Sequence, residues 1–127
     1  PAGKMTVLWF TNLCEDCRGK IPLLEKLRLE AGSRCRILAV SILGEDERLP
    51  RQVAPSCGFP FLLDPQDIVS GRLGLTHPPG TCPLHNLFIV APSGRILFRR
   101  HLSAMDPEEF HALWRRLLEE HADRKAF

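Results

Sequence analysis

The sequence predicts an α/β domain in which a central mixed β-sheet is flanked by helices on both faces. Short apolar runs typical of buried strands alternate with helical patterns, a hairpin pattern lies in the last third, and an amphipathic helix follows it. The 127 residues are 44% hydrophobic and 25% charged, which suits a compact domain with its own core. We therefore expect a single domain over residues 1–127.

Strands and helices alternate in the first two thirds of the chain. Met5–Phe10 is an almost continuous apolar run, as in strands buried on both faces. Apolar residues at helical spacing predict a helix over Cys17–Glu30, with Gly32 as its stop, and Arg36–Leu43 is a second strand. The further elements expected here are a helix over Glu45–Ala54, a short strand over Phe59–Leu63 and a short helix over Asp67–Leu73.

The last third predicts an antiparallel hairpin followed by a helix. The strands Asn86–Val90 and Arg95–Arg100 flank a Pro-Ser-Gly turn. Asp106 is a typical N-cap and Pro107 a typical first helical residue, and apolar residues then recur on one face. The terminal helix is therefore expected to pack this face against the sheet.

Charge and hydropathy exclude several classes of function. The formal charge of +2 is too small, and the basic residues too dispersed, to indicate a nucleic-acid partner or an anionic membrane surface. No apolar run approaches the roughly 18 residues of a membrane span, so we expect no direct membrane insertion by this chain. Because the chain begins at Pro1 rather than Met, the lack of a leader says nothing about its compartment.

A Cys-x-x-Cys pair, Cys14 and Cys17, lies where the first strand gives way to a helix. A thiol at a helix N-terminus faces unpaired backbone N–H groups that favour its thiolate, and a partner three residues later is close enough for a disulfide. The same spacing supplies half of many zinc sites, but no second Cys-x-x-Cys and no His-x-x-x-His follows. The pattern therefore favours dithiol redox chemistry, without a metal.

The segments around this pair resemble a known family. Val7-Leu8-Trp9-Phe10 precedes Cys14-Glu15-Asp16-Cys17-Arg18, and Phe59-Pro60-Phe61 and Phe88-Ile89-Val90 follow in the same order. Together they resemble the thioredoxin superfamily, most closely its TlpA/ResA-type thiol-disulfide oxidoreductases of the AhpC/TSA-redoxin group. The likeness extends over most of the chain and includes Pro22, five residues after the second cysteine, where a proline bends the helix.

The resemblance implies a thioredoxin-like fold and an enzyme that exchanges disulfides with protein partners. Cys14 would be the exposed attacking thiol and Cys17 the buried resolving thiol, with a mixed disulfide as intermediate. The redox-active disulfide would be the only redox group, with no cofactor. Because Glu15 and Asp16 oppose thiolate formation at Cys14, we expect a weakly acidic thiol and a protein that reduces its partners.

Thioredoxin-like proteins carry a substrate-binding loop with a cis-proline facing the dithiol, and here the sequence departs from the family pattern. The family position falls on His85, whereas the nearest proline is Pro83. Either Pro83 is the displaced equivalent, with Cys82-Pro83 as the cis bond, or His85 takes the site. Cys82 is a third exchangeable thiol, a partner for Cys57, or a small buried apolar group.

Two alternatives use the same cysteine. Cys14, Cys17 and His85 would form a soft two-sulfur, one-nitrogen set for Cu(I), as in Sco-like copper chaperones, although those proteins space their cysteines differently. Thr11 three residues before Cys14 resembles the peroxiredoxin motif, with Cys14 as the peroxidatic thiol, although the proline of that motif is replaced by Val7.

The resemblance also implies partners and location. Its partners would be protein thiols or disulfides, together with an upstream thiol reductant. The protein itself would be a monomer. TlpA-like proteins are extracytoplasmic, either periplasmic or membrane-tethered, so we expect the same setting here. The five cysteines do not fix the compartment, and a cytoplasmic location stays open.

Overall fold

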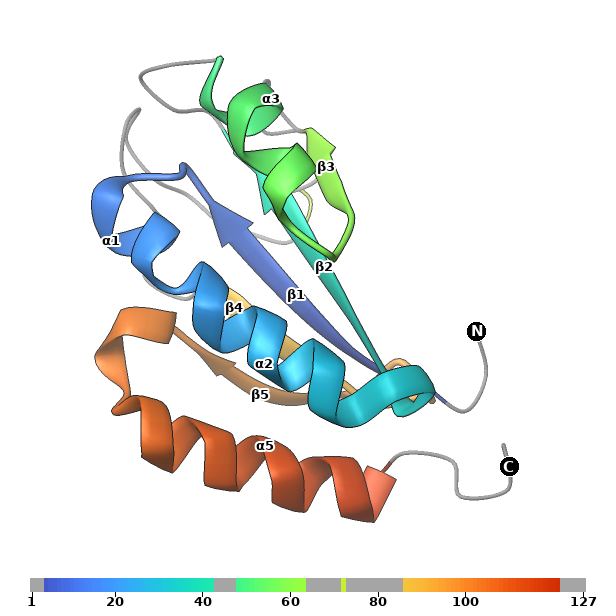
Figure 1. Cartoon of the computed structure of the whole chain (residues 1–127). Coiled ribbons are helices and arrows are strands. Elements are labelled where there is room, and N and C mark those ends of the chain that lie inside the picture. Colours follow the sequence, from blue (N-terminus) through green and yellow to red (C-terminus); the bar gives the residue numbers. More distant parts are fainter. Residues whose placement is uncertain (1–3, 43–47, 64–71, 73–85, 122–127) are drawn as a thin grey trace.

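A five-stranded mixed sheet forms the centre of the computed structural model, which describes residues 4–42, 48–63, 72 and 86–121. The strand order is β3-β2-β1-β4-β5. β1 is Met5–Thr11, β2 is Cys35–Ser41, β3 is Phe61–Leu63, β4 is Leu87–Val90 and β5 is Ile96–Arg100. β1, β2 and β3 run parallel, and β4 pairs antiparallel with both β1 and β5 (Figure 1). The predicted mixed sheet is thus confirmed.

The helix expected over Cys17–Glu30 is divided into two. α1 spans Glu15–Gly19 and α2 spans Ile21–Ala31, with Lys20 ending one and beginning the other. Pro22 lies in the first turn of α2 and has no N–H to donate to the carbonyl of Arg18, so the α1 ladder cannot continue. The break at Pro22 was predicted, but as a bend within one helix. The structure shows a short separate helix before it.

In the described part of the segment between β2 and β3, the α-helix ends at Val53, one residue before the predicted end. α3 covers Leu49–Val53, a 3-10 turn follows at Ala54–Ser56, and β3 begins only at Phe61. Pro55 lies inside this turn and cannot donate a backbone hydrogen bond, which is a reason for the α-helix to stop before it. The first residues of the helix predicted over Glu45–Ala54 lie outside the described residues, as does the helix predicted over Asp67–Leu73 except for Arg72.

The hairpin and the terminal helix match the sequence prediction closely. The turn between β4 and β5 contains Gly94 at φ 93°, a backbone conformation that favours glycine. α5 spans Pro107–His121, and the Asp106 carboxylate accepts hydrogen bonds from the backbone N–H groups of Glu108 and Glu109 at 3.1 and 3.2 Å. A 3-10 turn at Leu102–Ala104 (η3), which the sequence analysis missed, connects β5 to α5.

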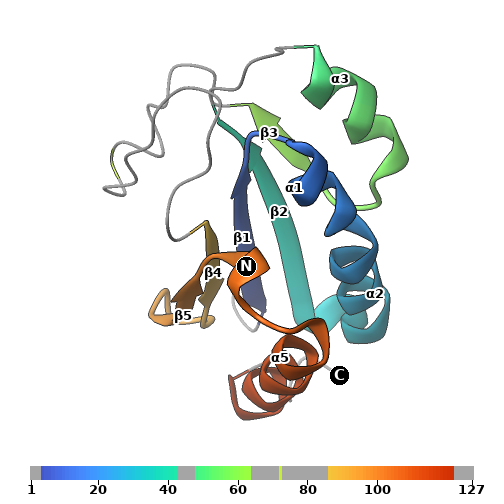
Figure 2. The same cartoon turned by 90° about the vertical axis from the view of Figure 1, so that its left-hand side faces the viewer.

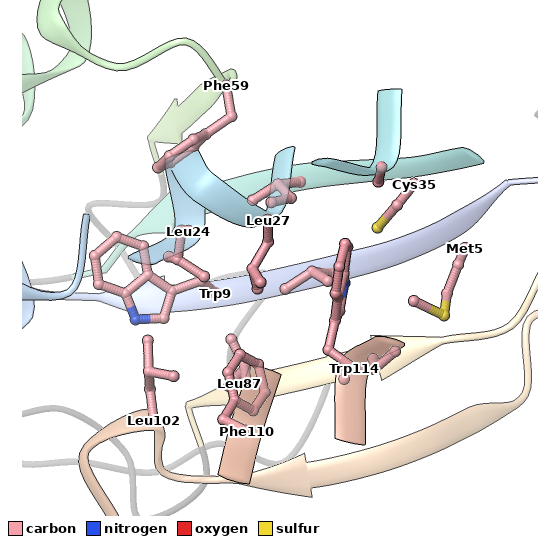
Figure 3. Packing of buried hydrophobic residues seen from close by; sticks show 14 of the residues in the cluster. Met5, Trp9, Leu24, Leu27, Cys35, Phe59, Leu87, Leu102, Phe110 and Trp114 are labelled. Carbon is pink, nitrogen blue, oxygen red and sulfur yellow. The ribbon is translucent and has the colours of Figure 1, made fainter. Parts of the chain in front are cut away.

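The main core lies between the sheet and the two long helices α2 and α5, which Figure 2 shows on the same side of the sheet. Figure 3 shows Trp9 from β1, Leu24 and Leu27 from α2, and Trp114 from α5 meeting in this layer. Each of these four side chains is fully buried. Both tryptophans are therefore core residues.

The opposite face of the sheet carries a second cluster, because strand residues alternate between the faces. Its buried members are Phe10, Val40, Ile42 and Phe88. The rings of Phe10 and Phe88 pack edge to face, with their centroids 5.9 Å apart. The described helices that pack on the sheet, α2 and α5, both belong to the first cluster. Helical cover on the second face therefore stays a prediction, as does the single domain over residues 1–127.

Two leucines of α2 provide a matched test of this core. Leu27 is fully buried, so Leu27→Ala is expected to lower the free energy of unfolding by about 2–5 kcal/mol. Leu29 is 70% exposed, and Leu29→Ala should change the free energy by no more than about 0.5 kcal/mol. Urea unfolding followed by tryptophan fluorescence measures both. Equal losses in the two variants would contradict the assignment of the buried face of α2.

Candidate dithiol active site

Cys14 is the N-cap of α1, and its side chain is exposed. Its sulfur accepts a hydrogen bond from the backbone N–H of Cys17 at 3.4 Å, and its carbonyl accepts one from Arg18 at 2.9 Å. An N-cap residue normally uses a side-chain oxygen for this purpose, and here the sulfur takes that place. The Cys14 sulfur is thereby directed at the first turn of the helix.

Cys17 lies one turn further along α1 and is only 2% exposed. It belongs to the main core cluster together with Trp9 and Leu24. The pair is therefore asymmetric, with one thiol open to solvent and the other closed off by the core. This asymmetry follows the exposures predicted for an attacking and a resolving thiol, while the catalytic roles themselves stay predictions.

The turn before Cys14 is constrained by side-chain hydrogen bonds. Thr11 is fully buried, and its hydroxyl oxygen accepts from the backbone N–H of Leu13 at 2.9 Å. Leu13, also fully buried, has φ 57°, which for a residue with a bulky side chain costs of order 1–2 kcal/mol. Burial of Leu13 and its bond to Thr11 hold this strained turn in place. The turn fixes the direction in which the chain delivers Cys14 to α1.

Asn12 contacts both cysteines and was not singled out by the sequence analysis. Its side-chain oxygen accepts the backbone N–H of Cys14 at 3.0 Å, and the Cys17 sulfur donates to the same oxygen at 3.9 Å. An asparagine bonded to the backbone two residues ahead is a common turn feature, so the Cys14 contact had a sequence signal. The contact with Cys17 had none, because it depends on how α1 is placed.

Burial is the main influence on the acidity of the exposed thiol. Partial burial of its sulfur raises the pKa of Cys14 above the ordinary value of 9.0 and outweighs the hydrogen bond from the Cys17 backbone, which lowers it. The direction agrees with the predicted weakly acidic thiol, but the leading cause is burial rather than the charges of Glu15 and Asp16. The predicted help from the helix dipole is also small, because α1 is only five residues long.

Asp16, the second residue between the cysteines, connects the dithiol turn to a distant part of the chain. Its carboxylate accepts a hydrogen bond from the Ser103 hydroxyl in η3. The backbone N–H of Ser103 in turn donates to the Nδ1 atom of His101 at 3.1 Å. The segment between β5 and α5 therefore lies beside the dithiol, and Asp16 has a docking role there besides its charge.

Several predicted residues cannot be placed. Cys82, Pro83 and His85 lie outside the described residues, so the choice between Pro83 and His85 at the family's cis-proline position stays open, as does the predicted substrate loop. Within the described part of the chain, no three His, Cys, Asp or Glu side chains are grouped so as to hold a metal ion. The copper hypothesis needs His85 and is therefore untested, and the peroxidase hypothesis is likewise untested.

The other described cysteines lie away from this turn. Cys35 is 5% exposed at the start of β2, and burial raises its pKa to about 11, while a Trp114 contact lowers it slightly. Cys57 is half-buried, and its thiol donates to the Val53 carbonyl at 3.6 Å. Cys35 is thus a small buried apolar side chain of the core.

The comparisons with known proteins agree with this geometry. The sequence profile of the AhpC/TSA family matches residues 2–99, which is most of the chain and includes the dithiol turn. The chain belongs to the AhpC/TSA family. Among curated proteins, no sequence matches it significantly.

Solved structures similar to this AhpC/TSA-family protein share its thioredoxin-like fold. DsbF of MTB is 24% identical with a TM-score of 0.69, and the alignment covers 91% of this chain and 82% of DsbF. StoA of Bacillus subtilis is 16% identical with a TM-score of 0.62, and the alignment covers 88% of this chain and 83% of StoA. A secreted disulfide oxidoreductase of Mycobacterium tuberculosis is 18% identical with a TM-score of 0.63, and the alignment covers 87% of this chain and 80% of that protein. The predicted fold and superfamily resemblance are confirmed.

The raised pKa of Cys14 predicts that its thiol reacts slowly at neutral pH and faster as the pH rises. Alkylation of the reduced protein by iodoacetamide at Cys14 should rise with pH to a midpoint above 9.0, because burial favours the protonated sulfur. Mass spectrometry of the peptide containing Cys14, over a pH series, gives the midpoint. A midpoint below the ordinary value of 9.0 would contradict burial as the dominant influence on this thiol.

Proposed function

We propose that this protein is a thiol-disulfide oxidoreductase that reduces disulfides of protein partners through Cys14 and Cys17. The observation that carries the proposal is the pairing of an exposed thiol at the start of α1 with a buried thiol one turn later. A sulfur that is only 2% exposed and lies one turn from Cys14 is shielded from outside reagents, which suits intramolecular exchange with Cys14.

The reaction proceeds by two exchanges. The Cys14 thiolate attacks one sulfur of the partner's disulfide, and the other partner sulfur leaves as a thiolate. The Cys17 thiolate then attacks the Cys14 sulfur, which breaks the mixed disulfide and releases the reduced partner. The protein is left with a Cys14–Cys17 disulfide, and an upstream thiol reductant returns it to the dithiol. No cofactor is needed, because the electrons are carried by the two sulfurs.

The direction we propose is reduction of the partner. Strong oxidants of this chemistry have a very acidic nucleophilic thiol, because a stabilised thiolate stabilises the reduced form. Burial acts in the opposite direction at Cys14, where it raises the pKa. A reduced form without this stabilisation gives up its electrons more readily, which supports a reductant.

We further propose protein thiols as the partners and an extracytoplasmic location. The similar structure from Mycobacterium tuberculosis is that of a secreted protein, and disulfides in protein substrates persist mainly in oxidising compartments. No helix in the described ranges is long and apolar enough to cross a membrane.

Turnover of insulin disulfides tests the proposal. With dithiothreitol as electron donor, the protein should accelerate the precipitation of reduced insulin, and Cys14→Ser should abolish the acceleration because no mixed disulfide can form. Cys17→Ser should also lose turnover. When the reduced Cys17→Ser variant is mixed with insulin after dithiothreitol has been removed, it should accumulate the mixed disulfide, which non-reducing electrophoresis detects as an added insulin chain.

Cys57→Ser is the matched control for these variants. Cys57 is a half-buried thiol outside the dithiol turn, so its replacement should leave the rate of insulin reduction within about twofold, given the small effect expected of substitutions away from a site. Equal rates for the unaltered protein, Cys14→Ser and a reaction without protein would overturn the proposed function.

A further inference from the structure

A single atom, the side-chain oxygen of Asn12, contacts both members of the dithiol. It lies 3.0 Å from the backbone nitrogen of Cys14 and 3.9 Å from the sulfur of Cys17. Asn12 is half-buried in the turn between β1 and α1, with fully buried Thr11 and Leu13 on either side. The chain on both sides of Asn12 is therefore fixed, and this restricts the movement of its side chain.

The chemistry of the contacts determines which way the amide faces. The backbone N–H of Cys14 can only donate, so the amide atom that faces it must be the oxygen. Turning the amide would direct its NH2 group at another donor and remove the acceptor of Cys14. The Cys17 sulfur meets the same oxygen, which has no proton to give. This contact exists as a hydrogen bond only while Cys17 is a protonated thiol that donates to the oxygen.

Such a contact favours the neutral form of Cys17. A hydrogen bond donated by a thiol is lost when the thiol loses its proton, and the oxygen lone pairs then face a negative sulfur. The burial of Cys17 in the apolar core acts in the same direction. Cys17 must become a thiolate before it can attack the Cys14 sulfur, so both influences delay this attack.

We propose that Asn12 is a positioning residue that delays resolution of the mixed disulfide by holding Cys17 as a thiol, while it fixes the backbone of Cys14. This inference rests on the proposed exchange reaction. In the delayed step, Cys17 gives up its proton to solvent and forms a bond to the Cys14 sulfur. The bond between Cys14 and the partner breaks, and the partner sulfur leaves with the electron pair. In this step Asn12 forms no bond to the partner and acts through its contact with the Cys17 sulfur.

Two substitutions separate the two contacts. Serine has a short side chain whose oxygen accepts from the backbone two residues ahead, so Asn12→Ser keeps an acceptor for the Cys14 N–H and loses the reach to Cys17. Aspartate has the shape of asparagine, so Asn12→Asp keeps both acceptor contacts and adds a negative charge beside Cys17. The near-identical shape also protects this variant against a failure to fold.

The Ellman reagent, DTNB, resolves the two exchanges in time. Attack by Cys14 releases a first thionitrobenzoate and leaves a mixed disulfide, and attack by Cys17 releases a second. The experiment uses the full chain with Cys57→Ser and Cys82→Ser, so that these two thiols do not react with DTNB. Cys35 is 5% exposed and reacts slowly. Stopped-flow absorbance over a pH series gives both rate constants and their pH midpoints.

With Asn12→Ser, the second rate constant at neutral pH should increase about threefold to tenfold, and its midpoint should fall by about half a unit to one unit, as expected for losing one hydrogen bond. With Asn12→Asp, the midpoint of the second step should rise instead, because a negative charge disfavours a nearby thiolate. The first rate constant in Asn12→Ser should stay within about twofold, because the acceptor for Cys14 is retained.

The outcomes distinguish this inference from the proposed function. Midpoints of the second step that are unchanged in both variants, or that move in the same direction, would overturn the role of Asn12 while leaving two-step exchange intact. A purely structural residue would change thermal stability and the first rate constant without opposite shifts of the second midpoint. If the chain with Asn12 in place releases only one thionitrobenzoate, as Cys17→Ser should, both the proposed function and the role of Asn12 are wrong.

Discussion

The missing backbone donor of Pro22 is the constraint on which the rest of the site depends. Because Pro22 cannot donate to the carbonyl of Arg18, the helix after β1 divides at Lys20. α2 is then free to follow the sheet and bury its apolar face, while α1 takes a direction of its own. One thiol is exposed and the other is buried in the core because the short helix begins beyond the carboxyl end of the central strand β1 and ends against α2.

Packing in the main core holds the dithiol turn in position. Trp9, four residues before the strained Leu13, is fully buried between the sheet and α2. α5 closes the same layer through Trp114, and η3 then brings Ser103 to Asp16. The dithiol turn is thus held at both of its ends, by the strand that leads into it and by a segment almost ninety residues later. A turn held in this way would keep the geometry of the two sulfurs defined during the proposed exchange.

Thiol acidity here is governed by surroundings rather than by nearby formal charge. The sequence predicted that the two acidic residues between the cysteines would control the acidity of Cys14. Burial is instead the leading influence on the pKa of Cys14, and Asp16 accepts a hydrogen bond from Ser103. Cys17 meets the amide oxygen of Asn12, an acceptor that suits a thiol and not a thiolate. The two thiols therefore have different environments although they are separated by only two residues, which is what an ordered sequence of attack and resolution requires.

The sequence by itself determined the strand positions, the capped terminal helix, the break at Pro22 and the Cys-x-x-Cys pair, because each depends on local periodicity, capping or a missing donor. It did not determine that α1 is separate, that η3 follows β5, or that Asn12 meets Cys17 and Ser103 meets Asp16. These contacts depend on where whole elements pack, and no local pattern encodes the distance between side chains on different elements. Tertiary structure therefore decided the environment of each sulfur, while the sequence had already placed Cys14 and Cys17 one helical turn apart.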